Sequence, residues 1–203
     1  MLIPLQLFLG AGWMRAGVEK VIDPSWWRGD ALLNFLEQQR PHMLPWFTPL
    51  ADGVLAPLAP VVAWAVLWMQ IGIAVCLFTN QRVKQALWTG ITLNVCFTMA
   101  GAVNPSAFYL VMQMAVLFAL SHRVREVVAV RRAVGFLIPA SLLASFARTI
   151  HPMAVIDDPA LVLAFTFVIA AITTLAISIP INRLVERLER SATGRRVVAR
   201  FII

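Results

Sequence analysis

The chain has 203 residues, of which 60% are hydrophobic and only 13% are charged, and its mean hydropathy is +0.80. These values lie far outside the range of a water-soluble domain, and they exclude a large soluble catalytic domain because membrane helices take up most of the length. The net charge of +7 comes from basic clusters at alternate connections, so it requires no nucleic-acid partner. The composition therefore predicts an integral membrane protein of the all-α class.

Six apolar runs, each near the ~20 residues that a transmembrane helix needs, follow one another along the chain. They lie near residues 3–22, 54–78, 84–101, 105–121, 133–150 and 159–180. We therefore expect a polytopic bundle of six transmembrane helices. Its expected parts are a four-helix core at 1–122 with an outer interfacial loop at 23–53, two additional helices at 123–180, and a basic amphipathic tail at 181–203.

Basic residues are concentrated in every second connection. Arg82 and Lys84 lie in one of these connections, and the next one and the tail hold further arginines. Because basic residues near the ends of spans remain on the cytoplasmic side, both termini and the tail are expected in the cytoplasm. The expected location is the plasma membrane of a bacterial cell, with residues 23–53 on the outer face.

The first predicted helix, residues 3–22, differs from the others because charged residues interrupt its apolar run. Arg15 and Glu19 are four residues apart and fall on one face, where they can pair, whereas Lys20 points elsewhere. An arginine at this depth costs at least about 2.5 kcal/mol to insert, so the pair is expected to face the interior of the bundle. It is either a structural bridge or part of a substrate or quinone site.

Three polar residues of later helices are grouped with this pair as a candidate polar pocket in the outer half of the membrane. They are Asn94 in the third predicted helix, and Tyr109 and Gln113, one turn apart in the fourth. Hydrogen bonding between helices is the alternative explanation, since such side chains commonly join helices in bundles.

Two dipeptides predict where helices begin. Asn104–Pro105 and Asp158–Pro159 each place an N-cap side chain before a proline at the first helical position, where its missing N–H costs nothing. We expect these residues to be structural caps of the fourth and sixth helices.

No haem or metal site is predicted. His42, His122 and His151 all fall in connections, so no two of them can bind a haem from facing helices. The sequence also lacks the Cys/His spacing of metal sites. We expect no covalent cofactor and keep a quinone as the candidate ligand.

Two stretches, GWMRAGVEKVIDPSWW at 12–27 and VNPSAFYLVMQMAVLFAL at 103–120, resemble the DoxX-like family, which includes DoxD-type small subunits of thiosulfate:quinone oxidoreductase. The resemblance covers about residues 5 to 121. Gly17 and Lys20 match a Gly-x-x-Lys-like pattern at the end of the first helix, and Asn104 and Pro105 match an Asn-Pro before the fourth. The resemblance implies a four-helix membrane core associated with quinones, sulfur compounds or oxidative-stress defence, and it supplies no catalytic residues.

Two functional hypotheses follow. In the first, the protein is a subunit of a membrane-associated redox system, quinone-linked through the candidate pocket. In the second, it is a non-catalytic assembly, scaffold or transport component of a membrane complex. Both include the lipid bilayer and other protein subunits as partners, bound through the membrane face or the basic tail, and both leave open whether the chain is an enzyme.

Overall fold

The computed structural model describes residues 3–120, 126–147 and 158–178, and every regular element in these ranges is a helix. The long helices are α1 (Ile3–Ile22), α5 (Ala59–Phe78), α6 (Val83–Met99), α7 (Val103–Ala119), α8 (Glu126–Ala144) and α10 (Pro159–Ser178). The short elements are α2 (Pro24–Arg28), α3 (Asp30–Gln39), η1 (Arg40–His42), α4 (Thr48–Leu50) and η2 (Ala51–Leu55). The predicted all-α class is confirmed. His122, His151 and the predicted tail at 181–203 lie outside the described residues.

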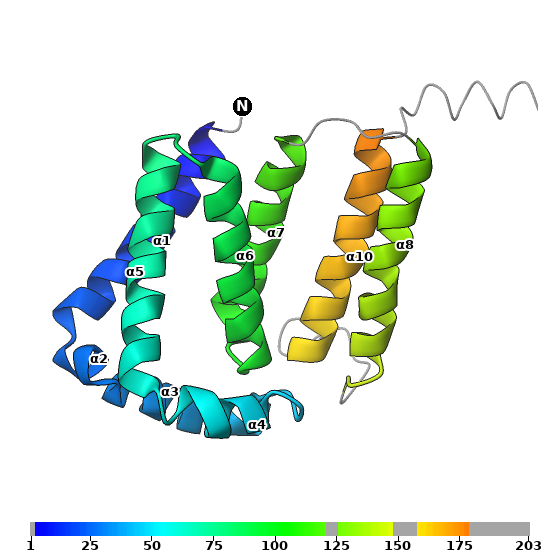
Figure 1. The fold of residues 1–203 in the computed structure, drawn as a ribbon. Helices are drawn as coiled ribbons and strands as arrows, with labels where there is room; N and C mark the ends of the chain where they lie inside the picture. The colour runs from blue at the N-terminus through cyan, green and yellow to red at the C-terminus, as the bar shows by residue number, and fades with distance from the viewer. Residues whose placement is uncertain (1–2, 121–125, 148–157, 179–203) are drawn as a thin grey trace, which may run out of the picture.

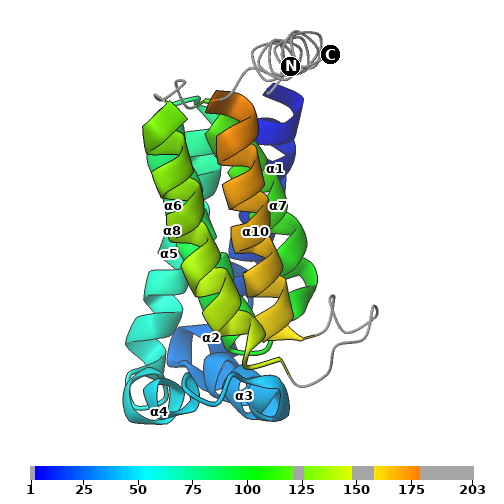
Figure 2. The ribbon, with the colours of Figure 1, turned by 90° about the vertical axis from the view of Figure 1, so that its right-hand side faces the viewer.

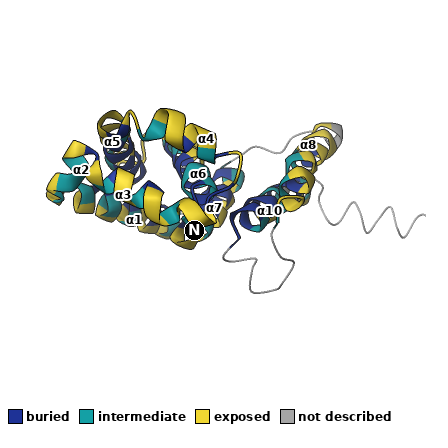
Figure 3. Cartoon of the chain, turned by 90° about the horizontal axis from the view of Figure 1, so that it is seen from below, coloured by how far each residue is buried: buried dark blue, intermediate teal, exposed yellow. Residues whose placement is uncertain are grey.

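Four long helices, α1, α5, α6 and α7, form a bundle in which neighbouring helices run in opposite directions (Figure 1). Helix α10 packs on α7 and α6, and α8 packs on α10, with the Phe136 and Phe167 rings 6.3 Å apart. The α8–α10 pair therefore forms a side of the molecule (Figure 2), and α10 separates α8 from α7 in the view along the bundle (Figure 3). The first residues of α1 and the last of α10 lie at the same end (Figure 1).

Residues 24–55, which we call the cap, lie across the opposite end of the bundle (Figure 1). The Trp26 indole Nε1 donates to the Ala63 carbonyl of α5 at 2.9 Å, and the Leu44 N–H donates to the Met99 carbonyl of α6 at 3.0 Å. Leu36 and Phe47 are buried in the cluster of apolar side chains between the cap and the bundle. The cap is therefore a packed layer that closes this end.

Helix α1 packs closely along α5 because two glycines on α1 face it. A Cβ atom at Gly17 would lie 2.8 Å from Cγ1 of Ile71, and one at Gly10 would lie 3.1 Å from the Phe78 ring. Near the first turn of α1, the Gln6 amide donates to the Leu77 carbonyl at 2.7 Å. This α1–α5 seam is closed from one end of α1 almost to the other.

Two helices in the described part of the chain are long and apolar enough to cross a membrane by length and composition: Ala59–Phe78 and Pro159–Ala176. Helix α7 is apolar but has 17 residues, and α1 contains Arg15, Glu19 and Lys20. The protein is therefore a helical membrane protein with two clear spans. The other four predicted spans and the location of the termini remain predictions.

Candidate functional site

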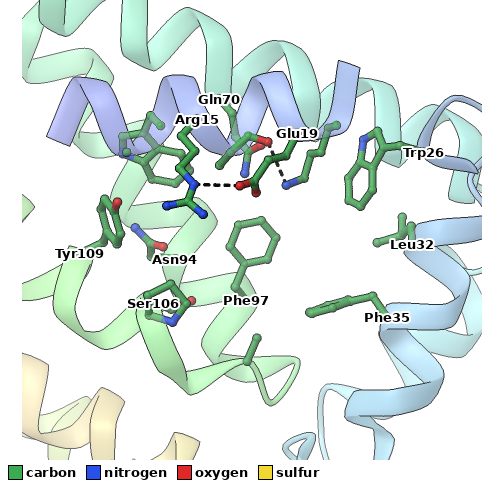
Figure 4. Close-up of a pocket in the computed structure, with 16 residues that line it drawn as sticks. Arg15, Glu19, Trp26, Leu32, Phe35, Gln70, Asn94, Phe97, Ser106 and Tyr109 are labelled. Carbon is green, nitrogen blue, oxygen red and sulfur yellow. Dashed lines mark hydrogen bonds and ion pairs between the residues drawn. The ribbon is translucent and has the colours of Figure 1, made fainter. Parts of the chain in front are cut away.

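A cavity of about 560 Å³ lies beneath the cap, between α1, α5, α6 and α7 (Figure 4). Its wall is aromatic on several sides and includes Trp13, Trp26, Phe35, Phe97 and Tyr109. Its polar lining residues are Arg15, Glu19, Lys20, Gln70, Asn94 and Ser106. A concave, mostly apolar space with a few polar groups is the usual form of a small-molecule site.

The cavity exists because α1 meets α7 over only part of its length. The Phe8 and Phe108 rings form an edge-to-face contact with centroids 6.4 Å apart, and one turn further along, Gly12 leaves room for the Tyr109 hydroxyl. A Cβ atom at Gly12 would overlap that hydroxyl. Past Gly12, α1 leans away from α7 toward the cap (Figure 1). We call the resulting space between the two helices the wedge.

Arg15 and Glu19 stand in the wedge and form the expected ion pair, with Nε and Oε1 2.8 Å apart (Figure 4). The expectation that the bundle encloses the pair is corrected, because the two side chains are 83% and 57% exposed within the isolated chain. The reason is the divergence of α1 from α7, which leaves no described helix to cover this face of α1. The pair therefore borders the opening of the cavity.

Lys20 lines the same cavity, which corrects the expectation that it points elsewhere. Its Nζ lies 4.7 Å from the centroid of the Trp26 ring and donates to the Ala16 carbonyl at 3.3 Å. Arg15 and Lys20 are about 140° apart around the helix. Both nevertheless line the cavity, which extends to Trp26 of α2, and the Trp26 ring attracts the Lys20 ammonium group. Among the described carboxylates, none forms an ion pair with Lys20.

The innermost polar side chains lie on α5, α6 and α7, and a hydrogen bond joins the last two helices. The Asn94 amide donates to Gln113 Oε1 at 3.2 Å, and both residues are buried. Gln113 lies behind Asn94 and is not part of the cavity lining, so four of the five predicted pocket residues border the cavity. Gln70, 2% exposed, borders it from α5.

Three buried polar atoms in this region have no hydrogen-bond partner among the described residues: Trp13 Nε1, Gln70 Oε1 and Gln113 Nε2. A buried polar atom without a partner costs about 1–3 kcal/mol, and such atoms are rare in native structures. Trp13 and Gln70 both line the cavity, so two of these unpaired atoms belong to side chains of its wall.

The two predicted caps differ in their contacts. Asp158 Oδ1 accepts from the backbone N–H of Ala160 at 2.8 Å and of Leu161 at 3.4 Å, as an N-cap side chain does. Asn104 has extended backbone angles, φ −92° and ψ 125°, directly before Pro105, and the helical part of α7 follows. Pro105 also lines the cavity, and Pro159 begins α10.

Charged residues of the cap hold its short elements together. Asp23 accepts from the backbone N–H and the hydroxyl of Ser25, and these bonds hold the pKa of Asp23 below its ordinary value. Arg40 donates two hydrogen bonds to Asp52, at 2.6 and 3.1 Å, which lower the pKa of Asp52. The bonds between Arg40 and Asp52 join η1 to η2 within the cap.

Sequence reasoning missed most of the apolar wall. In the sequence, Trp13, Phe97 and Phe35 look like ordinary membrane or interface residues. The spacing of apolar residues along a helix is the same for a cavity wall as for a lipid-facing surface. Trp26 carried a usable signal, because an indole six residues after a lysine at a helix end can meet its ammonium group once the chain turns, as Trp26 meets Lys20. Of the described residues, no three His, Cys, Asp or Glu side chains are grouped as a metal site would require.

Comparison with known proteins assigns the chain to a family. A family model described as "Methylamine utilisation protein MauE" matches residues 1–113, more than half of the chain, and this range contains every residue that lines the cavity. No curated protein and no solved structure matches. The match corrects the resemblance to the DoxX-like family, which depended on residues 12–27 and 103–120 and on the short motifs Gly-x-x-Lys and Asn-Pro within them. The chain belongs to the family of the methylamine utilisation protein MauE.

Proposed function

We propose that the protein is a membrane subunit of the redox system that serves methylamine utilisation, and that its cavity binds the head group of a quinone. Using methylamine as a nutrient requires oxidation of its carbon, and a membrane quinone is a carrier that can accept the electrons. The family assignment supports the first part of the proposal. The cavity supports the second.

The unpaired groups in the cavity wall carry the proposal. Trp13 Nε1–H can donate to an oxygen of the occupant, and the Gln70 amide can either donate or accept. A quinone presents a carbonyl where its reduced form presents a hydroxyl, so this pair of side chains suits both redox states. The aromatic wall matches the flat ring of such a head group.

The charges at the cavity argue against methylammonium as its occupant. Two cationic side chains, Arg15 and Lys20, line the space with one carboxylate, Glu19, and Arg15 already pairs with that carboxylate. A cation would lose hydration and meet a like charge, whereas a carbonyl oxygen accepts hydrogen bonds from these cations. The ligand is therefore a neutral or electron-rich molecule.

We also propose that the cap faces the outside of the cell and that both termini are cytoplasmic. The basic residues Arg82 and Lys84 lie at the end of the bundle opposite the cap, in a connection without acidic residues, whereas the two arginines of the cap, Arg28 and Arg40, are paired with Asp30 and Asp52. This charge distribution supports that orientation. Reporter fusions after Gly53 and after Ile203 test it, and cytoplasmic activity of the first fusion would contradict it.

The test of the quinone site is direct binding. Purified protein in lipid nanodiscs is titrated with decyl-ubiquinone, and quenching of tryptophan fluorescence reports binding because Trp13 and Trp26 line the cavity. Replacing Gln70 by Leu keeps the shape of the side chain and removes its amide, and we expect about tenfold weaker binding in a folded protein.

The matched control is Thr174→Val, which removes a buried polar group of α10 outside the cavity. It should bind decyl-ubiquinone as the wild type does. Absence of saturable binding to the wild-type protein would overturn the quinone assignment.

A non-catalytic assembly component is the second candidate function. The observation that favours it is the exposure of Arg15 and Glu19, since a helix of a partner subunit could cover the wedge and pair with them. Crosslinking from position 15 in cells separates the two functions: capture of a protein partner by the wedge favours assembly, whereas crosslinks to lipid or quinone favour the binding site.

A further inference from the structure

The boundaries of the cavity determine how an occupant can reach it. Trp26, Leu32 and Phe35 cover the side toward the cap. On the opposite side, the contact of Gly12 with Tyr109 closes the space between α1 and α7. Entry along the bundle axis is therefore blocked at both ends by packed side chains.

The remaining opening is lateral. Arg15 and Glu19 border it, and their side chains are 83% and 57% exposed, whereas Trp13, which lines the same cavity from α1, is buried. Arg15 lies seven residues before the last residue of α1, about 10 Å along the helix axis. If α1 spans the membrane, the opening is below the bilayer surface and faces lipid.

Two exposed phenylalanines mark the edge of this opening. Phe8 on α1 and Phe108 on α7 touch each other edge to face, yet they are 53% and 58% exposed, and Val111 on the next turn of α7 is 39% exposed. These side chains form an apolar strip along the line where α1 meets α7. The strip begins next to Tyr109, so it starts where the wedge ends.

We propose that the ligand enters the cavity sideways from the bilayer, between α1 and α7, and that it carries a long apolar tail that stays on the strip formed by Phe8 and Phe108. This inference rests on the proposed quinone site and names the part of the quinone that the cavity does not hold. The head group occupies the space beneath the cap, with Arg15 and Glu19 at the point where the tail leaves. A water-soluble molecule without a tail cannot make these contacts with the strip.

The test compares two probes that share one head group, the tail-less ubiquinone head group and decyl-ubiquinone. Both are titrated into wild-type protein in nanodiscs, and each concentration is corrected for partition into lipid. Enrichment of decyl-ubiquinone in the bilayer then does not appear as tighter binding to the protein. We expect the decyl probe to bind about tenfold more tightly after this correction. Phe108→Ala should weaken decyl-ubiquinone about fivefold and leave the tail-less probe unchanged, because only the tail contacts Phe108.

Phe165→Ala is the matched control, since Phe165 is a similarly exposed phenylalanine, 54%, on α10. It should change neither affinity. Equal corrected affinities of the two probes, or an equal effect of Phe108→Ala on both, would overturn the lateral route while leaving the quinone site in place. Saturable binding of neither probe would instead overturn the quinone site itself, and the lateral route with it.

Discussion

Helix α1 has one closed face and one open face, and the contrast explains where the cavity lies. Toward α5, Gly10 and Gly17 lie two turns apart and both allow close approach, so the α1–α5 seam is tight over most of the helix. Toward α7, the contacts are those of Phe8, Gly12 and Trp13, none of which lies past the middle of α1. Because α1 approaches α7 closely only up to its middle, the space between the two helices widens toward the cap and forms the wedge.

The two faces also differ in what fills the space next to the glycines. Gly17 faces Ile71, a β-branched side chain in a helix that is held on both sides. Gly12 faces the end of Tyr109, a side chain that can turn into an open cavity. The same kind of substitution should therefore damage folding on the closed face and ligand binding on the open face.

The largest effect is expected on the closed face. Gly17→Val adds a branched side chain where even a Cβ atom lies 2.8 Å from Ile71 Cγ1, and overpacking of this kind costs about 3 kcal/mol. The measurement is thermal unfolding in detergent, together with the yield of monodisperse protein.

Gly72→Val on α5 is the control for that substitution, because nothing lies within 4 Å of a Cβ atom at Gly72. It should leave the unfolding temperature close to that of the wild type. If the two variants were equally stable, the α1–α5 seam would not be as tight as the contacts indicate.

Gly12→Ala should lower ligand affinity with little change in stability. An added Cβ displaces the Tyr109 hydroxyl into the wedge, and the cost is offset because alanine in a helix is about 0.5–1 kcal/mol more favourable than glycine. The displaced ring narrows the opening, so decyl-ubiquinone should bind about tenfold more weakly. Normal affinity in this variant would mean that Tyr109 moves away from the cavity, and it would weaken the wedge as the entry route.

A smaller effect is expected for the ion pair. The double variant Arg15→Met with Glu19→Leu removes both charges at the opening, and we expect about threefold weaker binding of decyl-ubiquinone. The double variant should unfold close to the wild type, whereas either single variant leaves one charge of the pair without its partner beside lipid and should be less stable.

The matched control for this pair is Arg28→Met with Asp30→Leu, which removes an ion pair of similar length, 2.9 Å, on the cap and away from the cavity lining. Its affinity should equal that of the wild type. Single Arg15 and Glu19 variants as stable as the wild type would show that water reaches the pair, which contradicts an opening toward lipid.

The sequence predicts the helices well because apolar length and charge gaps are local properties. Residues 3–22 match α1, and α5 ends at Phe78 as predicted, although it begins at Ala59 and not near 54. The difference arises because Ala51–Leu55 form the wide turn η2, and Pro57 and Pro60 limit how far α5 extends toward the cap. The docking of the cap is a tertiary property that no local pattern contains.

The site was predicted in part for a similar reason. Arg15, Glu19, Asn94 and Tyr109 stand out because polar residues inside apolar runs are rare, and all four border the cavity. The exposure of Arg15 and Glu19 depends on the angle between α1 and α7, a tertiary property of the contacts that Phe8, Gly12 and Trp13 make with α7. A helical wheel gives the direction of a side chain from its own helix but not the distance to the next one, so it placed the ion pair inside the bundle.

The smallest effect expected is a pH dependence that belongs to the cap and not to either face of α1. Arg40 lowers the pKa of Asp52 in the folded protein, so ionised Asp52 contributes stability above its unfolded pKa of about 4, and this contribution is lost as the pH falls through the lower folded value. Wild type should therefore exceed Asp52→Asn in unfolding temperature at pH 7, and the difference should shrink once the pH falls below about 4. The pKa of Asp23 is also lowered. Because Asp23 titrates in both proteins, comparing them at each pH removes its contribution from the difference in unfolding temperature. Because the Arg40–Asp52 pair is about half exposed, the difference should be small. A difference that stays constant down to acidic pH would show that Asp52 stabilises the cap by shape and not by charge.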